Sequence, residues 1–273
     1  MTVATSRVKS LIITGFGLNC EAETTHALQT AGSDARQIHL NDIIAGDESL
    51  ADVHLLVFIG GFSFGDHIGA GTVFANRLRC RLRPQLEAFV AEGKLVLGIC
   101  NGFQTIARLG LVPAAGKHYF TEQATLAQNT QGVFRDAWTL LRANPDSPCV
   151  FTPGINRLPL PIRHGEGRFV ARDAQTLAHI EENDLVVFRY AHPQTGEATD
   201  EFPHNPNGSA HAIAGVCDPT GRIFGLMPHP EAYLSPYNHP QWTRQKLNGV
   251  LPEKGLGQLI FDNGVAFARQ HLV

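Results

Sequence analysis

An apolar run leads into a glycine-flanked cysteine at Leu95-Val96-Leu97-Gly98-Ile99-Cys100-Asn101-Gly102-Phe103-Gln104. Its first half is continuously apolar, as expected for a strand buried on both faces, and its second half suits a helix. Gly98 and Gly102 permit a sharp strand-to-helix turn that tips the cysteine out of the sheet, as in a nucleophile elbow. At the first turn of a helix, oriented N–H groups and the helix dipole favour a thiolate. The stretch therefore predicts a nucleophilic Cys100; the alternative is a buried structural cysteine at a strand end.

Around this elbow, short apolar runs alternate with amphipathic segments, which indicates β-α units that build a parallel sheet. We expect strands at 9–14, 36–40, 53–59 and 95–99 and helices at 21–31 and 72–92, with Pro84 kinking the second helix or starting another. From about 125 to 228 the sequence favours strands, at 138–141, 158–163, 185–190, 212–216 and 223–227, and a helix at 173–182 capped by Asp173. A closing helix is expected at 257–271. We interpret residues 1–273 as a single domain with an irregular insertion at 236–255.

The composition is that of a soluble globular protein. Of the 273 residues, 43% are hydrophobic and 17% charged, and a net charge of −3 without a long basic run argues against a nucleic-acid partner. No apolar stretch approaches the roughly 20 residues that cross a bilayer, and no signal peptide is recognisable, so we expect a cytoplasmic protein without a membrane partner. The five cysteines are far apart and include no C-x-x-C pair, which favours reduced thiols and predicts no metal site.

A thiolate nucleophile needs a group that accepts and returns its proton, and His229 is the best candidate among the histidines. It follows an apolar strand in Met227-Pro228-His229-Pro230-Glu231, where two prolines restrict the backbone. Glu231 is close enough to orient the imidazole and hold its tautomer, which is the third role in a catalytic triad. The alternative is a surface histidine in a rigid proline-bounded turn.

A glycine-rich loop, Gly60-Gly61-Phe62-Ser63-Phe64-Gly65-Asp66, follows the strand expected at 53–59. The tetrahedral oxyanion of acyl transfer needs about two hydrogen-bond donors. The backbone N–H of Asn101 can supply one, and that of Gly61 or Phe62 the other. The loop lacks the G-x-x-x-x-G-K-[ST] spacing of a phosphate-binding loop, so the sequence gives no sign of an ATP site.

Together these segments resemble the class I, triad-type glutamine amidotransferases. Within that class they are most similar to the glutaminase subunits of phosphoribosylformylglycinamidine synthases. The likeness spans nearly the whole chain and is carried by Gly17-Leu18-Asn19-Cys20 with Glu23-Thr24, Gly60 to Asp66 with Ala70-Gly71, Gly98 to Gln104, His164 to Phe169, Asn205 to Ser209 and Met227 to Glu231. The fold it implies is flavodoxin-like or Rossmann-like α/β: a mostly parallel sheet flanked by helices, with an additional β-rich segment.

The resemblance also implies site residues. Cys100, His229 and Glu231 would form a triad that hydrolyses glutamine to glutamate and ammonia. Gln104 and the strand that ends at Asn129 would help to hold glutamine.

A third motif, His164-Gly165-Glu166-Gly167-Arg168-Phe169, carries a less defined expectation. If the motif is functional, His164, Glu166 and Arg168 would shape the partner interface or the path of ammonia. The alternative is a hairpin with glycine-rich turn chemistry.

The partner implied by the resemblance is a synthetase subunit that uses ATP and magnesium. It would convert formylglycinamide ribonucleotide to the amidine, a step of purine biosynthesis, and a small third subunit remains an open question. No cofactor is expected on this chain, in agreement with the missing phosphate-binding loop. Two other readings stay open: a stand-alone cysteine hydrolase, such as a γ-glutamyl hydrolase or a peptidase, and a non-catalytic binding module of the same fold.

Overall fold

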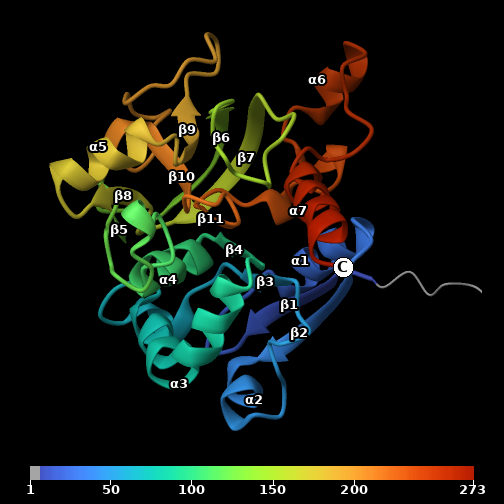
Figure 1. Ribbon diagram of the computed structural model, residues 1–273. Helices are drawn as coiled ribbons and strands as arrows, with labels where there is room; N and C mark the ends of the chain where they lie inside the picture. Colours follow the sequence, from blue (N-terminus) through green and yellow to red (C-terminus); the bar gives the residue numbers. More distant parts are fainter. Residues whose placement is uncertain (1–6) are drawn as a thin grey trace, which may run out of the picture.

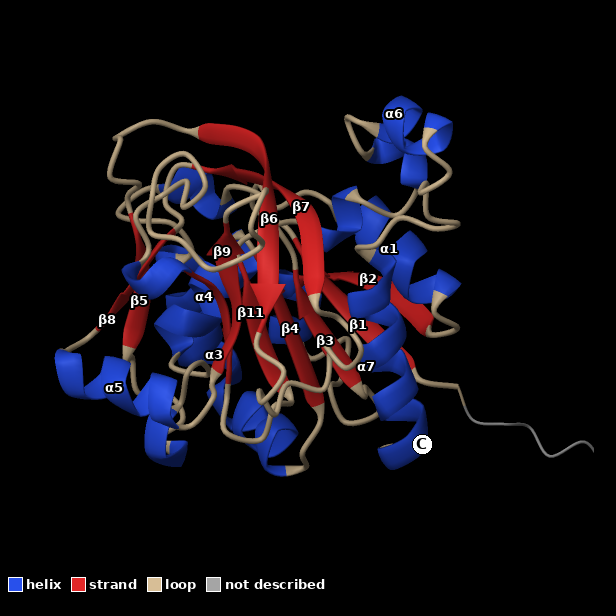
Figure 2. Cartoon of the chain, turned by 90° about the horizontal axis from the view of Figure 1, so that it is seen from above, coloured by secondary structure: helices blue, strands red, loops and turns tan. Residues whose placement is uncertain are grey.

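The computed structural model describes residues 7–273, in which a nine-stranded sheet is covered by helices on both faces (Figures 1 and 2). The sheet has the strand order β2-β1-β3-β4-β11-β10-β9-β6-β7. In chain order its strands are β1 (Lys9–Thr14), β2 (Asp34–His39), β3 (Leu55–Phe58), β4 (Leu95–Ile99), β6 (Arg135–Ala143), β7 (Arg157–His164), β9 (Val186–Ala191), β10 (Ile213–Cys217) and β11 (Ile223–Leu226). The predicted α/β class is confirmed.

The sheet is parallel in one half and antiparallel in the other. Strands β2, β1, β3, β4 and β11 run parallel to one another, whereas β10, β9, β6 and β7 are joined by antiparallel pairs. The central parallel strands β3, β4 and β11 are buried from end to end, because helices cover both faces of the sheet there. Parallel strands place their carboxyl ends, and the residues that follow, at one edge of the sheet.

The helices are α1 (Glu21–Thr30), α2 (Leu40–Ala45), α3 (Thr72–Ala91), α4 (Asn101–Leu109), α5 (Ala174–Glu182), α6 (Trp242–Leu247) and α7 (Gln258–His271). Helices α3 and α4 lie on one side of the sheet and α1 and α7 on the other (Figure 2). As predicted, Asp173 caps α5: its carboxylate accepts a hydrogen bond from the N–H of Thr176 at 2.7 Å. Among the described residues no helix combines the length and apolar character needed to cross a membrane.

Helix α3 continues through Pro84, so the expectation of a second helix starting there is wrong. The buried side chains Leu78 and Leu82 precede the proline, and Leu86 and Phe89 follow it. Because this apolar stripe keeps its helical spacing on both sides of Pro84, packing holds the whole helix in place and offsets the missing N–H.

The strands β5 (Ala124–Ala127) and β8 (Arg168–Ala171) form a separate two-stranded antiparallel sheet. Strand β8 follows β7 directly in the chain but pairs with β5 instead. The hairpin alternative for the segment around His164 is therefore wrong. The turn between β7 and β8 lies where the two sheets meet.

The segment 236–255 is less irregular than predicted, since it contains a short 3-10 helix (Pro236–Asn238) and α6. The side chain of Ser235 caps the 3-10 helix in a capping box, and Tyr237 packs edge-on against Trp242 with ring centroids 5.3 Å apart. Figure 2 shows α6 standing away from the sheet.

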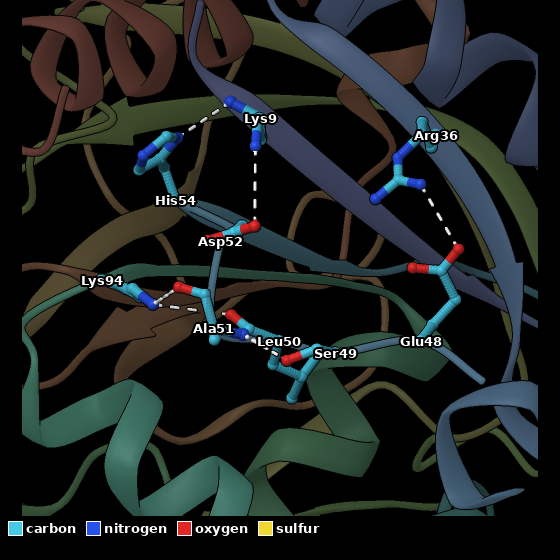
Figure 3. A network of polar contacts seen from close by, with 9 residues as sticks. All are labelled: Lys9, Arg36, Glu48, Ser49, Leu50, Ala51, Asp52, His54 and Lys94. Atoms are coloured by element: carbon cyan, nitrogen blue, oxygen red, sulfur yellow. Dashed lines mark hydrogen bonds and ion pairs between the residues drawn. The ribbon is translucent and has the colours of Figure 1, made fainter. Parts of the chain in front are cut away.

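At the amino ends of the parallel strands, polar contacts tie the loop before β3 to its neighbours (Figure 3). The ammonium group of Lys94, a nearly buried residue, donates to the carbonyl oxygens of Leu50 and Ala51 and lies 2.6 Å from the carboxylate of Glu92. The N–H of Lys9 donates to His54 Nδ1 at 2.9 Å. These contacts brace the end of the sheet opposite to the predicted nucleophile, which follows the carboxyl end of β4.

Candidate active site

Cys100 occupies the elbow between β4 and α4, with a positive φ of 52° and 4% of its surface exposed. The flanking glycines are required by close packing. A Cβ on Gly98 would lie 2.7 Å from the side chain of Ile106, and one on Gly102 would overlap the carbonyl oxygen of Phe58 in β3. Only small residues let α4 approach the sheet this closely, which fixes Cys100 at the amino end of the helix.

His229 reaches Cys100 because β11 lies next to β4 and runs parallel to it. The N–H of Cys100 donates to the carbonyl oxygen of Leu226 at 2.8 Å, which joins the carboxyl ends of the two strands. Gly60, at the end of β3, completes the arrangement: a Cβ there would lie 2.9 Å from Cε1 of His229. Three neighbouring strand ends thus converge on one imidazole.

Glu231 lies against the imidazole, with its Oε1 2.5 Å from Nδ1 of His229, and both side chains are buried. Burial alone would lower the pKa of His229. The carboxylate of Glu231 and the sulfur of Cys100 outweigh that cost, so the pKa lies well above its usual value. Nε2 of His229 has no hydrogen-bond partner within residues 7–273, and the thiol of Cys100 points to the carbonyl oxygen of Arg163 at 3.6 Å. This arrangement suits an imidazole that exchanges a proton with Cys100 while Glu231 holds Nδ1.

The loop after β1 brings a second thiol, Cys20, to the same place, which sequence reasoning missed. One ligand atom from each of Cys20, His229 and Glu231 lies within 4.8 Å of the other two. Burial raises the pKa of Cys20, whose thiol donates to Oδ1 of Asn19 at 3.0 Å. The position of Cys20 could have been found from the strand order. Because β1 and β3 are adjacent parallel strands, Cys20, which follows β1, lies at the same edge of the sheet as the loop after β3.

Of the predicted oxyanion donors, Phe62 is not available in this structure, because its N–H donates to the carbonyl oxygen of Gly17 at 2.9 Å. The N–H of Gly61 has no such partner within the described chain. The N–H of Asn101 belongs to the first residue of α4, which has no acceptor within its own helix. Gly61 and Asn101 remain the two candidate donors.

Gln104 is engaged within the protein. Its Nε2 donates to the carbonyl oxygen of Glu166, and its Oε1 accepts from Nδ2 of Asn101 at 3.0 Å. The carboxylate of Glu166 accepts from the N–H of Ala70 at 2.9 Å. Gln104 and Glu166 therefore link α4 to the loops after β3 and β7.

The side-chain amide of Asn129 already hydrogen-bonds to other groups of the protein through both its nitrogen and its oxygen. Its side chain therefore does not offer the predicted contact to glutamine. Its Nδ2 donates to the carbonyl oxygens of Val133 and His164 at 3.0 and 2.9 Å, and its Oδ1 accepts from the N–H of Gly167 at 3.0 Å. Asn129 instead holds the turn after β7. The N-P-N-G-S segment closes around the same turn, since Nδ2 of Asn207 donates to the carbonyl oxygen of Gly167 at 2.9 Å.

His164 is buried, which does not suit the predicted contact with a partner. Burial, and then the nearby charge of His229, lower the pKa of His164 to about 3, so its ring stays neutral. Glu166 and Arg168 are partly exposed, as an interface or ammonia-path role requires.

Three comparisons with known proteins show which family the chain resembles. Residues 7–268 match the family described as the CobB/CobQ-like glutamine amidotransferase domain. The chain is 44% identical over 265 residues to phosphoribosylformylglycinamidine synthase subunit PurQ of Methanococcus maripaludis, covering 95% of this chain and 97% of the relative. It is 40% identical to the PurQ subunit of Dehalococcoides mccartyi, covering 97% of this chain and 99% of that one.

Among solved structures, the chain resembles one described as PurLQS from Thermotoga maritima, with a TM-score of 0.69, 28% identity, and coverage of 96% of this chain and 99% of that one. The likeness to the two PurQ relatives and to this structure extends over nearly the full length of the chain. The chain belongs to the CobB/CobQ-like glutamine amidotransferase family and, within it, to the family of PurQ subunits of phosphoribosylformylglycinamidine synthase.

Proposed function

We propose that the chain hydrolyses glutamine to glutamate and ammonia with Cys100, His229 and Glu231, and delivers the ammonia to a synthetase subunit. The observation that carries this proposal is the buried His229–Glu231 pair, 2.5 Å apart, beside a cysteine at a strand-to-helix elbow. A carboxylate-oriented imidazole next to a thiol is the arrangement that nucleophilic acyl transfer requires.

In the first half-reaction Cys100 Sγ attacks the side-chain amide carbon of glutamine. The N–H groups of Gly61 and Asn101 stabilise the resulting oxyanion. His229 receives the thiol proton and returns it to the departing nitrogen, which leaves as ammonia while a thioester remains on Cys100. In the second half, His229 takes a proton from water, the resulting hydroxide attacks the thioester, and glutamate leaves as the thiol is restored.

The synthetase partner would use ATP and magnesium to convert formylglycinamide ribonucleotide to formylglycinamidine ribonucleotide. The PurQ names of the relatives and the PurLQS neighbour support such a partner. We assign no cofactor to this chain. Glu166 and Arg168 remain candidates for the partner-facing surface or the ammonia path.

The test is a reconstituted complex in which glutamine or an ammonium salt supplies the nitrogen. Cys100→Ala should abolish glutamine-dependent amidine formation while the ammonium-dependent reaction survives, because only ammonia release needs the thiolate. Cys80→Ala, which changes an exposed cysteine, is the matched control. Loss of both reactions in a Cys100→Ala chain that still binds its partner would contradict the proposed division of labour. A Cys100→Ala chain that keeps glutamine-dependent activity would move the nucleophile elsewhere.

A further inference from the structure

The segment Gly17-Leu18-Asn19-Cys20 carries part of the family resemblance, yet no step of the proposed mechanism uses it. It lies between β1 and α1 and pairs with the loop after β3. The N–H of Asn19 donates to the carbonyl oxygen of Gly60, and the N–H of Phe62 donates to that of Gly17, each at 2.9 Å. These two bonds fix the segment, and with it the residue at its end, against the loop that carries the candidate oxyanion donor.

That last residue, Cys20, has a strained backbone and lies beside the triad. Its φ of 72° is in the left-handed region, which is unfavourable for a residue with a Cβ. Strained residues of this kind cluster at functional sites. Helix α1, which begins after Cys20, packs against the 3-10 helix that carries Glu231. The sulfur of Cys20 lies within 4.8 Å of an imidazole nitrogen of His229 and of a carboxylate oxygen of Glu231.

The side chain of Cys20 lies between the buried pair and solvent. His229 and Glu231 are buried, whereas Cys20 is partly exposed. Oε2 of Glu231 has no hydrogen-bond partner among residues 7–273. A buried oxygen with a free lone pair accepts a hydrogen bond from any water that reaches it. The groups that cover this carboxylate therefore decide whether water enters.

A cysteine suits such a covering position. Burial raises the pKa of Cys20, so its thiol is neutral at neutral pH. The thiol donates its proton to Oδ1 of Asn19 at 3.0 Å. A neutral thiol behaves as a small hydrophobic group, which adds no charge beside the pair and attracts water only weakly.

We propose that Cys20 is a positioning residue that keeps water from the His229–Glu231 pair and holds the pair in alignment with Cys100. This inference rests on the proposed function. Where water is excluded, the attraction between a carboxylate and an imidazolium is stronger than in water. Cys20 thus acts on the reaction through His229 and not on glutamine itself.

Loss of the Cys20 side chain should lower the pKa of His229. The titratable groups that act on this ring are Glu231, Cys100, Cys20 and His164, of which His164 is neutral. The pKa of His229 lies well above its usual value because the attraction of Glu231 and Cys100 outweighs the cost of burial. Water would weaken both the attraction and the cost of burial, so the pKa should return toward its usual value, which is downward.

The test is an NMR titration of the His229 ring in the full chain, with the signal assigned by its loss in His229→Asn. Cys20→Ala removes the thiol, and Cys20→Ser keeps a neutral group of similar size. Cys80→Ala, which changes an exposed cysteine, is the matched control. If alanine disturbs folding, Cys20→Gly removes the same side chain and suits the positive φ at this position.

Cys20→Ala and Cys20→Gly should lower the titration midpoint of His229 by at least about 0.5 pH units. Cys20→Ser should restore most of this shift, and Cys80→Ala should cause none. An unchanged midpoint in Cys20→Ala would overturn the proposal. Equal shifts in the alanine and serine variants would also overturn it, because the effect would then not depend on the group that covers the pair.

Glutaminase kinetics of the reconstituted complex separate positioning from substrate binding. Cys20→Ala should lower kcat by at least about 10-fold and leave the KM for glutamine within about 3-fold, because misalignment of the base affects the chemical step. A rise in KM with an unchanged kcat would contradict the proposal and place Cys20 in glutamine binding. If even the unaltered chain hydrolysed no glutamine, the proposed function would fail, while the titration would still decide whether Cys20 acts on His229.

Discussion

The side-chain amide of Asn101 donates a hydrogen bond to the carboxylate of Asp66 at 3.0 Å. This bond joins the residue after the nucleophile to the loop after β3, which also carries the candidate oxyanion donor Gly61. Burial, and then repulsion from Glu166, raise the pKa of Asp66 to about 6. The two sides of the candidate oxyanion site are therefore joined through a carboxyl group that titrates near neutral pH.

Asp66→Asn should stabilise the chain above about pH 6 and lose that advantage below about pH 4. A carboxyl group whose pKa is raised on folding binds its proton more tightly in the folded state, so its contribution to stability falls as pH rises from 3.8 to about 6. Asparagine does not titrate and still offers Asn101 an acceptor. Because Asp66 is partly exposed, solvent screening limits the gain to about 1 kcal/mol. Urea unfolding of both chains between pH 4 and 8 measures it, and a difference independent of pH would contradict the assignment.

The sequence was sufficient to predict the parts of the site that depend on local patterns. The elbow at Cys100 follows from glycines placed around a strand end, and His229 and Glu231 follow from a proline-bounded motif after another strand. The role of Asn129 could not be predicted in the same way, because most of its side-chain hydrogen bonds are to His164 and Gly167, which are distant in sequence. The blocked N–H of Phe62 likewise depends on Gly17, which only the pairing of the two loops brings near.

Gly60→Ala should reduce glutaminase turnover while the chain remains folded. The new Cβ would lie 2.9 Å from Cε1 of His229 and 3.6 Å from Cβ of Cys100. His229 is buried and bonded to Glu231, so the imidazole must shift relative to the thiol. A displacement of about 1 Å in such a group costs roughly 10²-fold in rate.

The control for that change is Gly165→Ala, since a Cβ on Gly165 meets nothing within 4 Å. Steady-state kinetics of both variants, together with thermal unfolding, separate displacement of His229 from general destabilisation. If the two variants were equally active, the contact between Gly60 and His229 would not limit the reaction.

His229→Asn should lower glutaminase turnover by roughly 10² to 10⁴, the usual effect of removing a general base. Glu231→Gln should cost less, because the carboxylate only orients the imidazole and stabilises its charged form. It should also lower the pKa of His229, since the charge of Glu231 favours the protonated ring. Single-turnover kinetics and an NMR titration of the His229 ring check the two effects. A wild-type rate for His229→Asn would require another base, whereas an unchanged pKa in Glu231→Gln would remove Glu231 from the triad.

The isolated chain should hydrolyse glutamine slowly. Its rate should rise at least about 10-fold when the synthetase, ATP and the formylglycinamide ribonucleotide are present. The reason is that correct alignment of one oxyanion donor changes the rate of such a reaction by a factor of about 10² or more. We expect this control to act at Gly61. Its loop is held to the segment after β1 by backbone hydrogen bonds, from Asn19 to Gly60 and from Phe62 to Gly17, each of 2.9 Å.

Gly61 itself has a φ of 128°, a conformation that favours glycine, so a docked partner can reorient its N–H at small energetic cost. Ammonia released before docking would be lost to water, which makes such coupling useful. Ammonia production by the purified chain, measured with and without the partner and its substrates, tests the expectation. A purified chain as fast as the full complex would contradict the coupling and favour a stand-alone cysteine hydrolase.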